Sequence, residues 1–284
     1  MYELVTLTKR HIKNYLRDKM SVFFSFLSII ILLVIYLLFL ASLYGNLEGF
    51  TEVENSIYTV GYIMGGVIVI GTITLSLGVI GSYVTDLESK KINGFLVSPI
   101  KRSRLIISYY LSTVIITLFF MLLMFLLVFL YLGILVGYWY SLTVVLYSIL
   151  TIIVFVFISS PLVVFLATLI KSNNAFAALS AIIGTVIGFI SGIYVPLSIL
   201  SPFMSNLASL MPFSHMTIFL RRLLIGDDIL IQIPDEALND LGLKNLNVFN
   251  LNLSIYLVLG IFLVISLSLL VFSYLRVNKK QKNL

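Results

Sequence analysis

The chain has 284 residues, of which 60% are hydrophobic, 11% are charged and none is cysteine, and its mean hydropathy is +1.13. Soluble domains carry about 25% charged residues, so the composition excludes a soluble globular protein, and the missing cysteines exclude disulfides and thiolate metal sites. The net charge of +6 fits basic loops beside anionic lipid headgroups better than nucleic-acid binding.

Residues 3–20, ELVTLTKRHIKNYLRDKM, predict an amphipathic helix. Apolar residues such as Leu7 and Tyr15 recur at helical spacing, and basic residues fill most of the remaining positions. Such a helix lies on the cytoplasmic face of a membrane with its basic side toward the headgroups. The alternative is a solvated tail whose charges only fix the topology.

Uncharged apolar stretches long enough to span a membrane follow along the chain. A spanning helix needs about 20 mostly apolar residues, and the run that begins at Ser21 is too long for a cleaved signal peptide. The predicted spans are 21–44, 57–85, 105–132, 141–170, 175–195 and 251–275. All are expected to be helical, because an isolated strand cannot satisfy its backbone in lipid.

The loops orient these spans. Of the 18 Lys and Arg residues, 15 lie in the segments 1–20, 86–104, 171–174 and 276–284. The positive-inside rule therefore places these segments, and with them both termini, in the cytoplasm. The segments 45–56, 133–140 and 196–250 are then on the outer side.

Several motifs are missing from the sequence. No glycine is followed by lysine, so the chain has no phosphate-binding P-loop and is not itself expected to hydrolyse ATP. The predicted spans hold no charged residue, which argues against a proton- or metal-driven carrier. His11 and His215 lie at different depths and predict no metal pair.

The cytoplasmic loop 85–105, TDLESKKINGFLVSPIKRSRL, places apolar residues among charges. Gly94 and Pro99 punctuate it. An exposed apolar knob of this kind suits docking into a groove of a partner protein, and the alternative is an ordinary loop with an interfacial turn.

Small residues gather in the second and fifth spans. Gly184, Gly188 and Gly192 follow a four-residue spacing that forms a smooth helical stripe, either for close packing or for one wall of a pathway. A second set opens the second span, where hydroxyls weakly indicate a polar lining. The predicted packing or pathway residues are Gly61, Gly65, Thr72, Ser76, Gly184, Gly188 and Gly192.

Three of the six prolines interrupt the apolar segment after the fifth span. The pieces 197–210 and 212–225 are each too short to cross about 30 Å of hydrocarbon, and the topology places both on the outer side. Broken backbone at membrane depth is tolerated only against protein or a water-filled cavity. We therefore expect a re-entrant helical hairpin over 196–225. Its predicted gate residues are Pro196, Pro202, Pro212, Phe213, Arg221 and Arg222.

The order of these features resembles the ABC-2 type transporter permeases. The carrying segment is SGIYVPLSILSPFMSNLASLMPFSHMTIFLRRLLIG, 191–226, with a Gly-Pro-Pro-Pro-Arg-Gly order that ends at Gly226. The loop LESKKINGFLVSPIKRSRLIIS resembles the cytoplasmic coupling segment of that family, although Phe95 stands where threonine is usual. The resemblance assigns to ATPase coupling the residues Glu88, Lys91, Ile92, Gly94, Phe95, Leu96 and Pro99.

The resemblance implies an all-α polytopic plasma-membrane protein with six transmembrane helices, an interfacial helix over 1–20 and a hairpin over 196–225. It also implies a coupling loop at 86–104, an outer loop at 226–250, a cytoplasmic tail at 276–284 and a single domain over 1–284. Two cytoplasmic ATPase subunits that bind ATP and magnesium, a second permease copy and membrane lipids are the implied partners, with no nucleic acid and no cofactor on this chain.

The implied activity is export of an amphipathic small molecule, antibiotic, peptide or lipid-like substrate, with substrate passing near the second and fifth spans. Three alternatives stay open: an ion-coupled secondary transporter, a permease for polysaccharide or lipid-linked glycans, and a non-transporting scaffold, insertase or signalling subunit.

Overall fold

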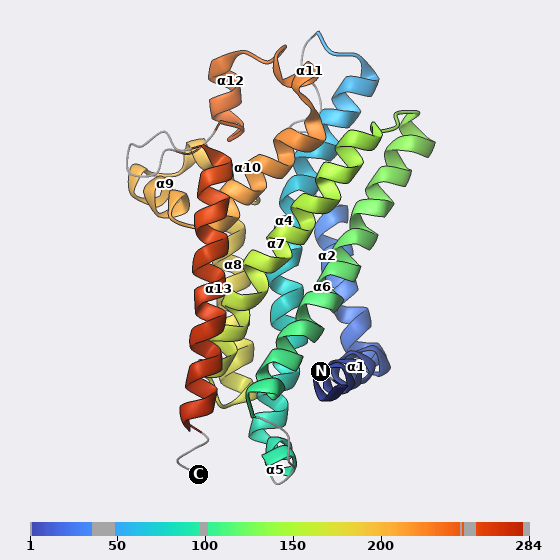
Figure 1. Ribbon diagram of the computed structural model, residues 1–284. Coiled ribbons are helices and arrows are strands. Elements are labelled where there is room, and N and C mark those ends of the chain that lie inside the picture. Colours follow the sequence, from blue (N-terminus) through green and yellow to red (C-terminus); the bar gives the residue numbers. More distant parts are fainter. Residues whose placement is uncertain (1, 36–48, 97–101, 245, 247–253, 281–284) are drawn as a thin grey trace.

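A computed structural model describes residues 2–35, 49–96, 102–244, 246 and 254–280 of the protein. Within these ranges every regular element is helical, which confirms the predicted all-α class (Figure 1). The elements are α1 Tyr2–Arg17, α2 Lys19–Ile35, α4 Glu52–Glu88, α5 Lys91–Leu96, α6 Arg102–Tyr131, η2 Leu132–Val136, α7 Leu142–Leu169, α8 Asn173–Ile190, η3 Leu197–Ile199, α9 Pro202–Ser209, α10 Pro212–Ile225, α11 Asp227–Leu230, α12 Asp235–Asp240 and α13 Ile255–Lys280.

Five helical stretches of the described chain are long and apolar enough to cross a membrane. They are Glu52–Glu88, Arg104–Val136, Leu142–Leu169, Asn173–Ile190 and Ile255–Val277. α2 represents the first predicted span, 21–44, of which residues 36–44 lie outside the described ranges. The fifth span was predicted to end five residues too late, at 195, because α8 ends at Ile190.

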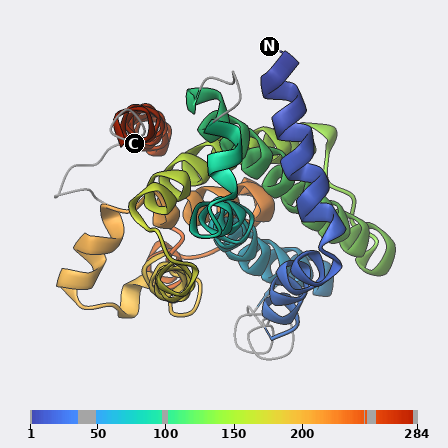
Figure 2. The ribbon, with the colours of Figure 1, turned by 90° about the horizontal axis from the view of Figure 1, so that it is seen from below.

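The functional segments gather at two ends of the helical bundle. α1, α5 and the last turns of α13 lie at one end, and α11 and α12 lie at the other (Figure 1). Viewed from below, α1 is seen along its length whereas α8 and α13 are seen end-on, so α1 lies across the bundle (Figure 2). Its buried face holds Leu7, Thr8, His11 and Tyr15. The amphipathic pattern predicts this helix, but His11 was not expected on the buried face.

α4 is the central helix of the bundle and packs on α6, α7, α8 and α10. In its most apolar stretch 89% of the residues are buried, compared with 17% in α8 and in α13. Its start is fixed by a capping box, in which Thr51 Oγ1 accepts from the Glu54 amide and the Glu54 carboxylate accepts from the Thr51 amide.

Hydroxyl groups, rather than charges, connect α4 to α6 and α7 inside the bundle. Thr72 Oγ1 lies 2.8 Å from Ser159 Oγ, and Ser76 Oγ lies 3.2 Å from both Thr117 Oγ1 and Ser160 Oγ. All five side chains are fully buried. Such interhelical bonds contribute on average about 0.6 kcal/mol each. Thr72 and Ser76 therefore pack helices together, which is the packing role among the two alternatives predicted for them.

The prolines after α8 begin helices instead of breaking one. Pro202 and Pro212 are the first residues of α9 and α10, and Pro196 is the N-cap of η3. A proline costs nothing at the first helical position, since its missing N–H would have no intrahelical partner there. The predicted piece 212–225 coincides with α10, whereas α9 is shorter than predicted.

Two glycines let α10 approach α4 closely. A Cβ on Gly65 would lie 2.8 Å from the backbone nitrogen of Arg221, and a Cβ on Gly61 would lie 3.1 Å from that of Ile225. Because these neighbours are backbone atoms, they cannot rotate away. The predicted role of Gly61 and Gly65 in packing is thus carried by a helix-on-helix contact.

We expect Gly65→Ala to destabilise the protein by about 1–3 kcal/mol, since the added methyl forces α4 and α10 apart. The matched control is Gly184→Ala in α8, where the new Cβ would meet only Thr74 Cγ2 at 3.7 Å. Thermal denaturation in detergent compares the two variants. Equal midpoints would contradict the packing argument.

Candidate functional site

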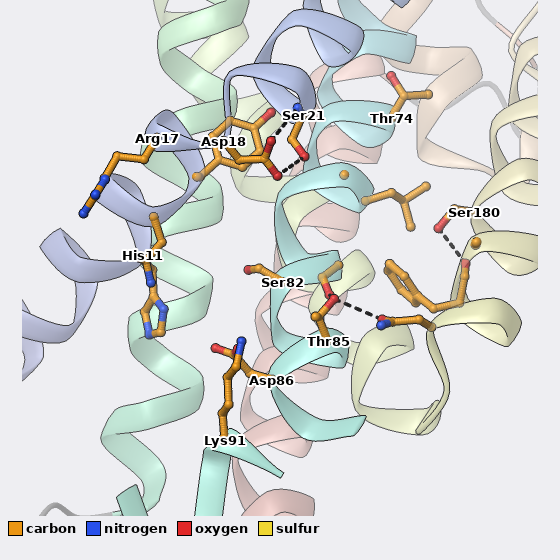
Figure 3. A pocket seen from close by; sticks show the side chains of 18 residues that line it. His11, Arg17, Asp18, Ser21, Thr74, Ser82, Thr85, Asp86, Lys91 and Ser180 are labelled. Atoms are coloured by element: carbon orange, nitrogen blue, oxygen red, sulfur yellow. Dashed lines mark hydrogen bonds and ion pairs between the residues drawn. The ribbon is translucent and has the colours of Figure 1, made fainter. Parts of the chain in front are cut away.

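A cavity of about 880 Å³ opens between the α1–α2 junction, α4 and α8 (Figure 3). It lies toward the end of the bundle that holds α5. Apolar residues such as Leu77 and Phe176 line it beside many polar ones. The polar lining consists of His11, Asn14, Tyr15, Arg17, Asp18, Ser21, Thr74, Ser82, Thr85, Asp86, Lys91, Asn173 and Ser180.

One face of α4 supplies the inner wall of the cavity. Thr74, Gly78, Gly81 and Thr85 follow a three- to four-residue spacing and all line it. The hydroxyls at Thr72 and Ser76 point to the opposite side. The sequence showed that α4 carries hydroxyls, and only the packing shows which of them are accessible from the cavity.

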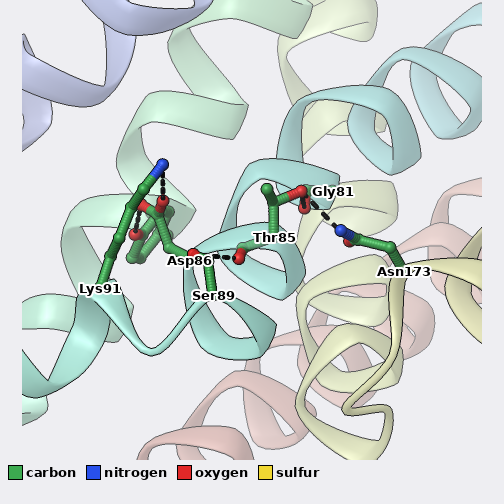
Figure 4. Close-up of polar contacts among 7 residues, drawn as sticks. Gly81, Thr85, Asp86, Ser89, Lys91 and Asn173 are labelled. Atoms are coloured by element: carbon green, nitrogen blue, oxygen red, sulfur yellow. Dashed lines mark hydrogen bonds and ion pairs between the residues drawn. The ribbon is translucent and has the colours of Figure 1, made fainter.

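Asp86 connects three helices at the edge of the cavity. Its carboxylate accepts a hydrogen bond from the Tyr109 hydroxyl at 2.6 Å and lies 3.9 Å from the Lys91 ammonium (Figure 4). The three residues belong to α4, α6 and α5. The side chain of Lys91 is 63% exposed, so its ion pair contributes little stability on its own. The bond to Tyr109 is therefore the stronger tie.

His11 docks α1 onto the same network. Its Nε2 lies 3.1 Å from Ser108 Oγ, and its ring stacks on Tyr109 with 3.8 Å between the ring centroids. Burial, aided by the charge of Arg10, lowers the pKa of His11 to about 4, although Asp86 acts to raise it. The imidazole is therefore neutral at pH 7 and serves as a packing group. Sequence reasoning missed this role, because a lone histidine among lysines reads as part of the basic face.

Lowering the pH from 7 to 5 should weaken the docking of α1. An exposed histidine has a pKa of about 6.5, so the docked state is fully favoured above that pH and loses stability as the pH falls toward 4. The loss at pH 5 is about 2 kcal/mol. The rate of proteolysis within α1 measures it, and His11→Phe, which stacks but does not titrate, should give a flat profile. A pH-independent rate in the unsubstituted protein would contradict this assignment.

The last turn of α4 also holds the start of α8. Thr85 Oγ1 donates to Asn173 Oδ1 at 3.1 Å (Figure 4). The backbone amide of Asn173 donates to Glu88 Oε2 at 3.2 Å. Ser172, the N-cap of α8, makes no side-chain capping bond. The carboxylate of Glu88, a residue of α4, thus accepts a hydrogen bond from the first amide of α8.

The predicted coupling residues divide between the interior and the surface. Ile92 is 3% exposed and belongs to the main core, so its predicted place on an exposed docking knob is wrong. Lys91 is paired with Asp86. Gly94 is open to solvent. The side chains of Phe95 and Leu96 lie outside the described part, as does the whole of Pro99.

Arg221, predicted as a gate residue, is 1% exposed and is the largest fully buried side chain in the described chain. Its Nε donates to the Tyr62 carbonyl at 2.9 Å, and its Nη2 donates to the Gly192 carbonyl at 3.0 Å. The guanidinium carbon also lies 3.7 Å from the centre of the Tyr62 ring. Arg221 therefore joins α10, α4 and the turn after α8. The available sequence signal was the apolar residues one turn away from it, Ile218, Leu224 and Ile225.

The other predicted gate residues have different surroundings. Pro212 and Phe213 are buried, Pro202 is exposed and Pro196 is half-buried. Arg222 is exposed beside a second cavity, of about 490 Å³, between α7, α10 and the start of α13.

The predicted glycine stripe is not continuous. Gly192 lies beyond the end of α8 with φ +73°, so the prediction of one helical face is wrong there. Its conformation is one that side chains rarely adopt. A Cβ on Gly188 would collide with the ring of Tyr194, which folds back over it. These two glycines shape the turn after α8.

Comparison with protein families finds one described as ABC-2 type transporter, whose model matches residues 2–225. The match includes α1, the cavity, α5 and Arg221. Comparison with curated proteins finds no match.

Proposed function

Since the chain belongs to the ABC-2 type transporter family, a family of membrane permease components of ABC transporters, we propose that it forms the substrate path of an ATP-driven exporter. α1 and α5 face the cytoplasm in this proposal, and two copies of a separate ATPase, which carries ATP and magnesium, bind at that end. The observation that carries it is the cavity that lies toward the end of the bundle where α5 lies, since Asp86, Lys91 and Asn173 line it.

The cavity fits an inward-open substrate site. It joins hydroxyl, amide and charged groups to the apolar residues Leu77 and Phe176, which suits an amphipathic molecule. One of its walls is α8, in whose apolar stretch only 17% of the residues are buried. We propose that a second permease copy covers α8 and completes the path, and that the complex lies in the plasma membrane with both termini inside.

The outer segment supplies the exit in this proposal. We propose that residues 196–225 are a re-entrant hairpin. Within it α10 packs on α4, whereas α9 is exposed at Phe203 and Met204. We propose that η3 and α9 are the part that moves. Arg221 is then a fixed anchor of the gate and does not line it.

The test is assembly and hydrolysis. The chain purified alone should hydrolyse no ATP, and co-expression with the proposed ATPase should give a complex that hydrolyses ATP and moves substrate into inverted vesicles. Robust hydrolysis by the single chain, or gradient-driven uptake in vesicles without ATPase, would refute the proposal.

A further inference from the structure

The end of α4 and the start of α8 meet through a side chain that the coupling assignment does not explain. Glu88 was expected to face a partner, yet its Oε2 accepts from the amide of Asn173, the first residue of α8. The first amides of any helix lack intrahelical partners, and a carboxylate there also meets the positive end of the helix dipole. Glu88 therefore caps α8 from another helix.

This cap matters because α8 has little else to hold it. Only 17% of the residues in its apolar stretch are buried, and its main packing partner is α4. In the described chain, two hydrogen bonds join the start of α8 to α4. They involve Glu88 and Thr85, which both lie in the last turn of α4.

The same turn is joined to α5 by a stiff connection. Ser89 and Lys90 alone separate the two helices. The Ser89 hydroxyl and amide both donate to the Thr85 carbonyl, and the Lys90 amide donates to the Leu87 carbonyl. Ile92 then anchors α5 in the core. If α5 moves, the last turn of α4, which holds Glu88 and caps α8, is therefore expected to move with it.

We propose that Glu88 is a positioning residue: it ties α8, one wall of the cavity, to α5, so that the width of the cavity mouth follows the position of α5. The inference rests on the proposed function for the role of α5, but the mechanical link itself is a property of this chain alone.

The experiment measures the distance between α5 and α8 by spin labels. The chain has no cysteine, so Gly94→Cys and Ala178→Cys, both at exposed positions, give one defined pair. We expect a narrow distance distribution in the otherwise unsubstituted chain and one at least twofold broader in Glu88→Ala. Glu88→Gln keeps an oxygen acceptor and should retain most of the narrow distribution.

The matched control is Glu52→Ala, an exposed glutamate at the opposite end of α4, which should leave the distribution unchanged. An unchanged distribution in Glu88→Ala would overturn the inference, as would a Glu88→Gln distribution as broad as that of the alanine variant. Because these measurements use the chain without an ATPase, they stay decisive even if no ATPase partner is found.

Discussion

Replacing Arg221 by methionine is expected to destabilise the fold by about 3 kcal/mol. The carbonyl of Gly192 loses the guanidinium that donates to it, which costs about 1–3 kcal/mol for a buried acceptor. The cation–π contact with Tyr62 adds up to about 2 kcal/mol at a desolvated site. Relief of the desolvation of a buried cation offsets part of this loss. The apparent midpoint of thermal denaturation in detergent measures the difference.

Three further variants separate these contributions. Arg222→Met removes the same charge from the exposed neighbouring position and should leave the midpoint within about 1 °C, since surface substitutions change stability by less than about 0.5 kcal/mol. Arg221→Lys should lose most of the stability that Arg221 contributes, because one ammonium group cannot reproduce the two hydrogen bonds that the planar guanidinium donates. Tyr62→Phe keeps the ring and loses the hydroxyl that donates to the Leu241 carbonyl, so its stability should fall by about 1 kcal/mol. A methionine variant as stable as the parent would show that Arg221 is not an anchor.

Replacing Phe95 by aspartate should abolish ATPase binding and transport. Phe95 lies in α5, next to Gly94. A Cβ on Gly94 would meet no atom within 4 Å, so α5 is open to a partner at that position. In the proposed complex this position enters an apolar groove of the ATPase, where a carboxylate costs several kcal/mol, and each 1.4 kcal/mol weakens binding tenfold. Co-purification of the ATPase should therefore fall by more than 100-fold.

The control for this prediction is Ile231→Asp at the other end of the bundle, where the isoleucine is 81% exposed. It introduces the same charge and should leave co-purification intact. Undiminished assembly of the Phe95→Asp variant would exclude α5 as the docking element. Because Glu88 acts within the permease, Glu88→Ala should still assemble with the ATPase, which separates the two roles.

The course of the chain follows from local patterns. Hydropathy predicts the long helices because apolar runs of this length have one stable form in lipid. Pro202 and Pro212 are the first residues of α9 and α10, because a proline is favoured at the first helical position, although Pro161 lies inside α7. The amphipathic spacing predicts α1 in the same way.

The contacts between helices could not be predicted in this way. Thr72 and Thr74 are two residues apart on one helix, yet the first is buried against α7 and the second lines the cavity. Ile92 was predicted on an exposed knob and is a core residue. Arg221, predicted as a gate residue, and His11, which lies among basic residues, are also buried. Each outcome depends on which helix packs on a given face, and the local sequence pattern of one helix does not identify that packing partner.

Sequence alone therefore settled the membrane setting, the all-helical class and the family resemblance, since these depend on composition, on run length and on the order of prolines and glycines. The tertiary structure decided which polar groups meet: Glu88 with the start of α8, Asp86 with Tyr109, and Arg221 with Tyr62. Those pairs join residues from 23 to 159 positions apart. A polar group buried among helices must find a partner, and only the packing of distant helices determines which partner is within reach.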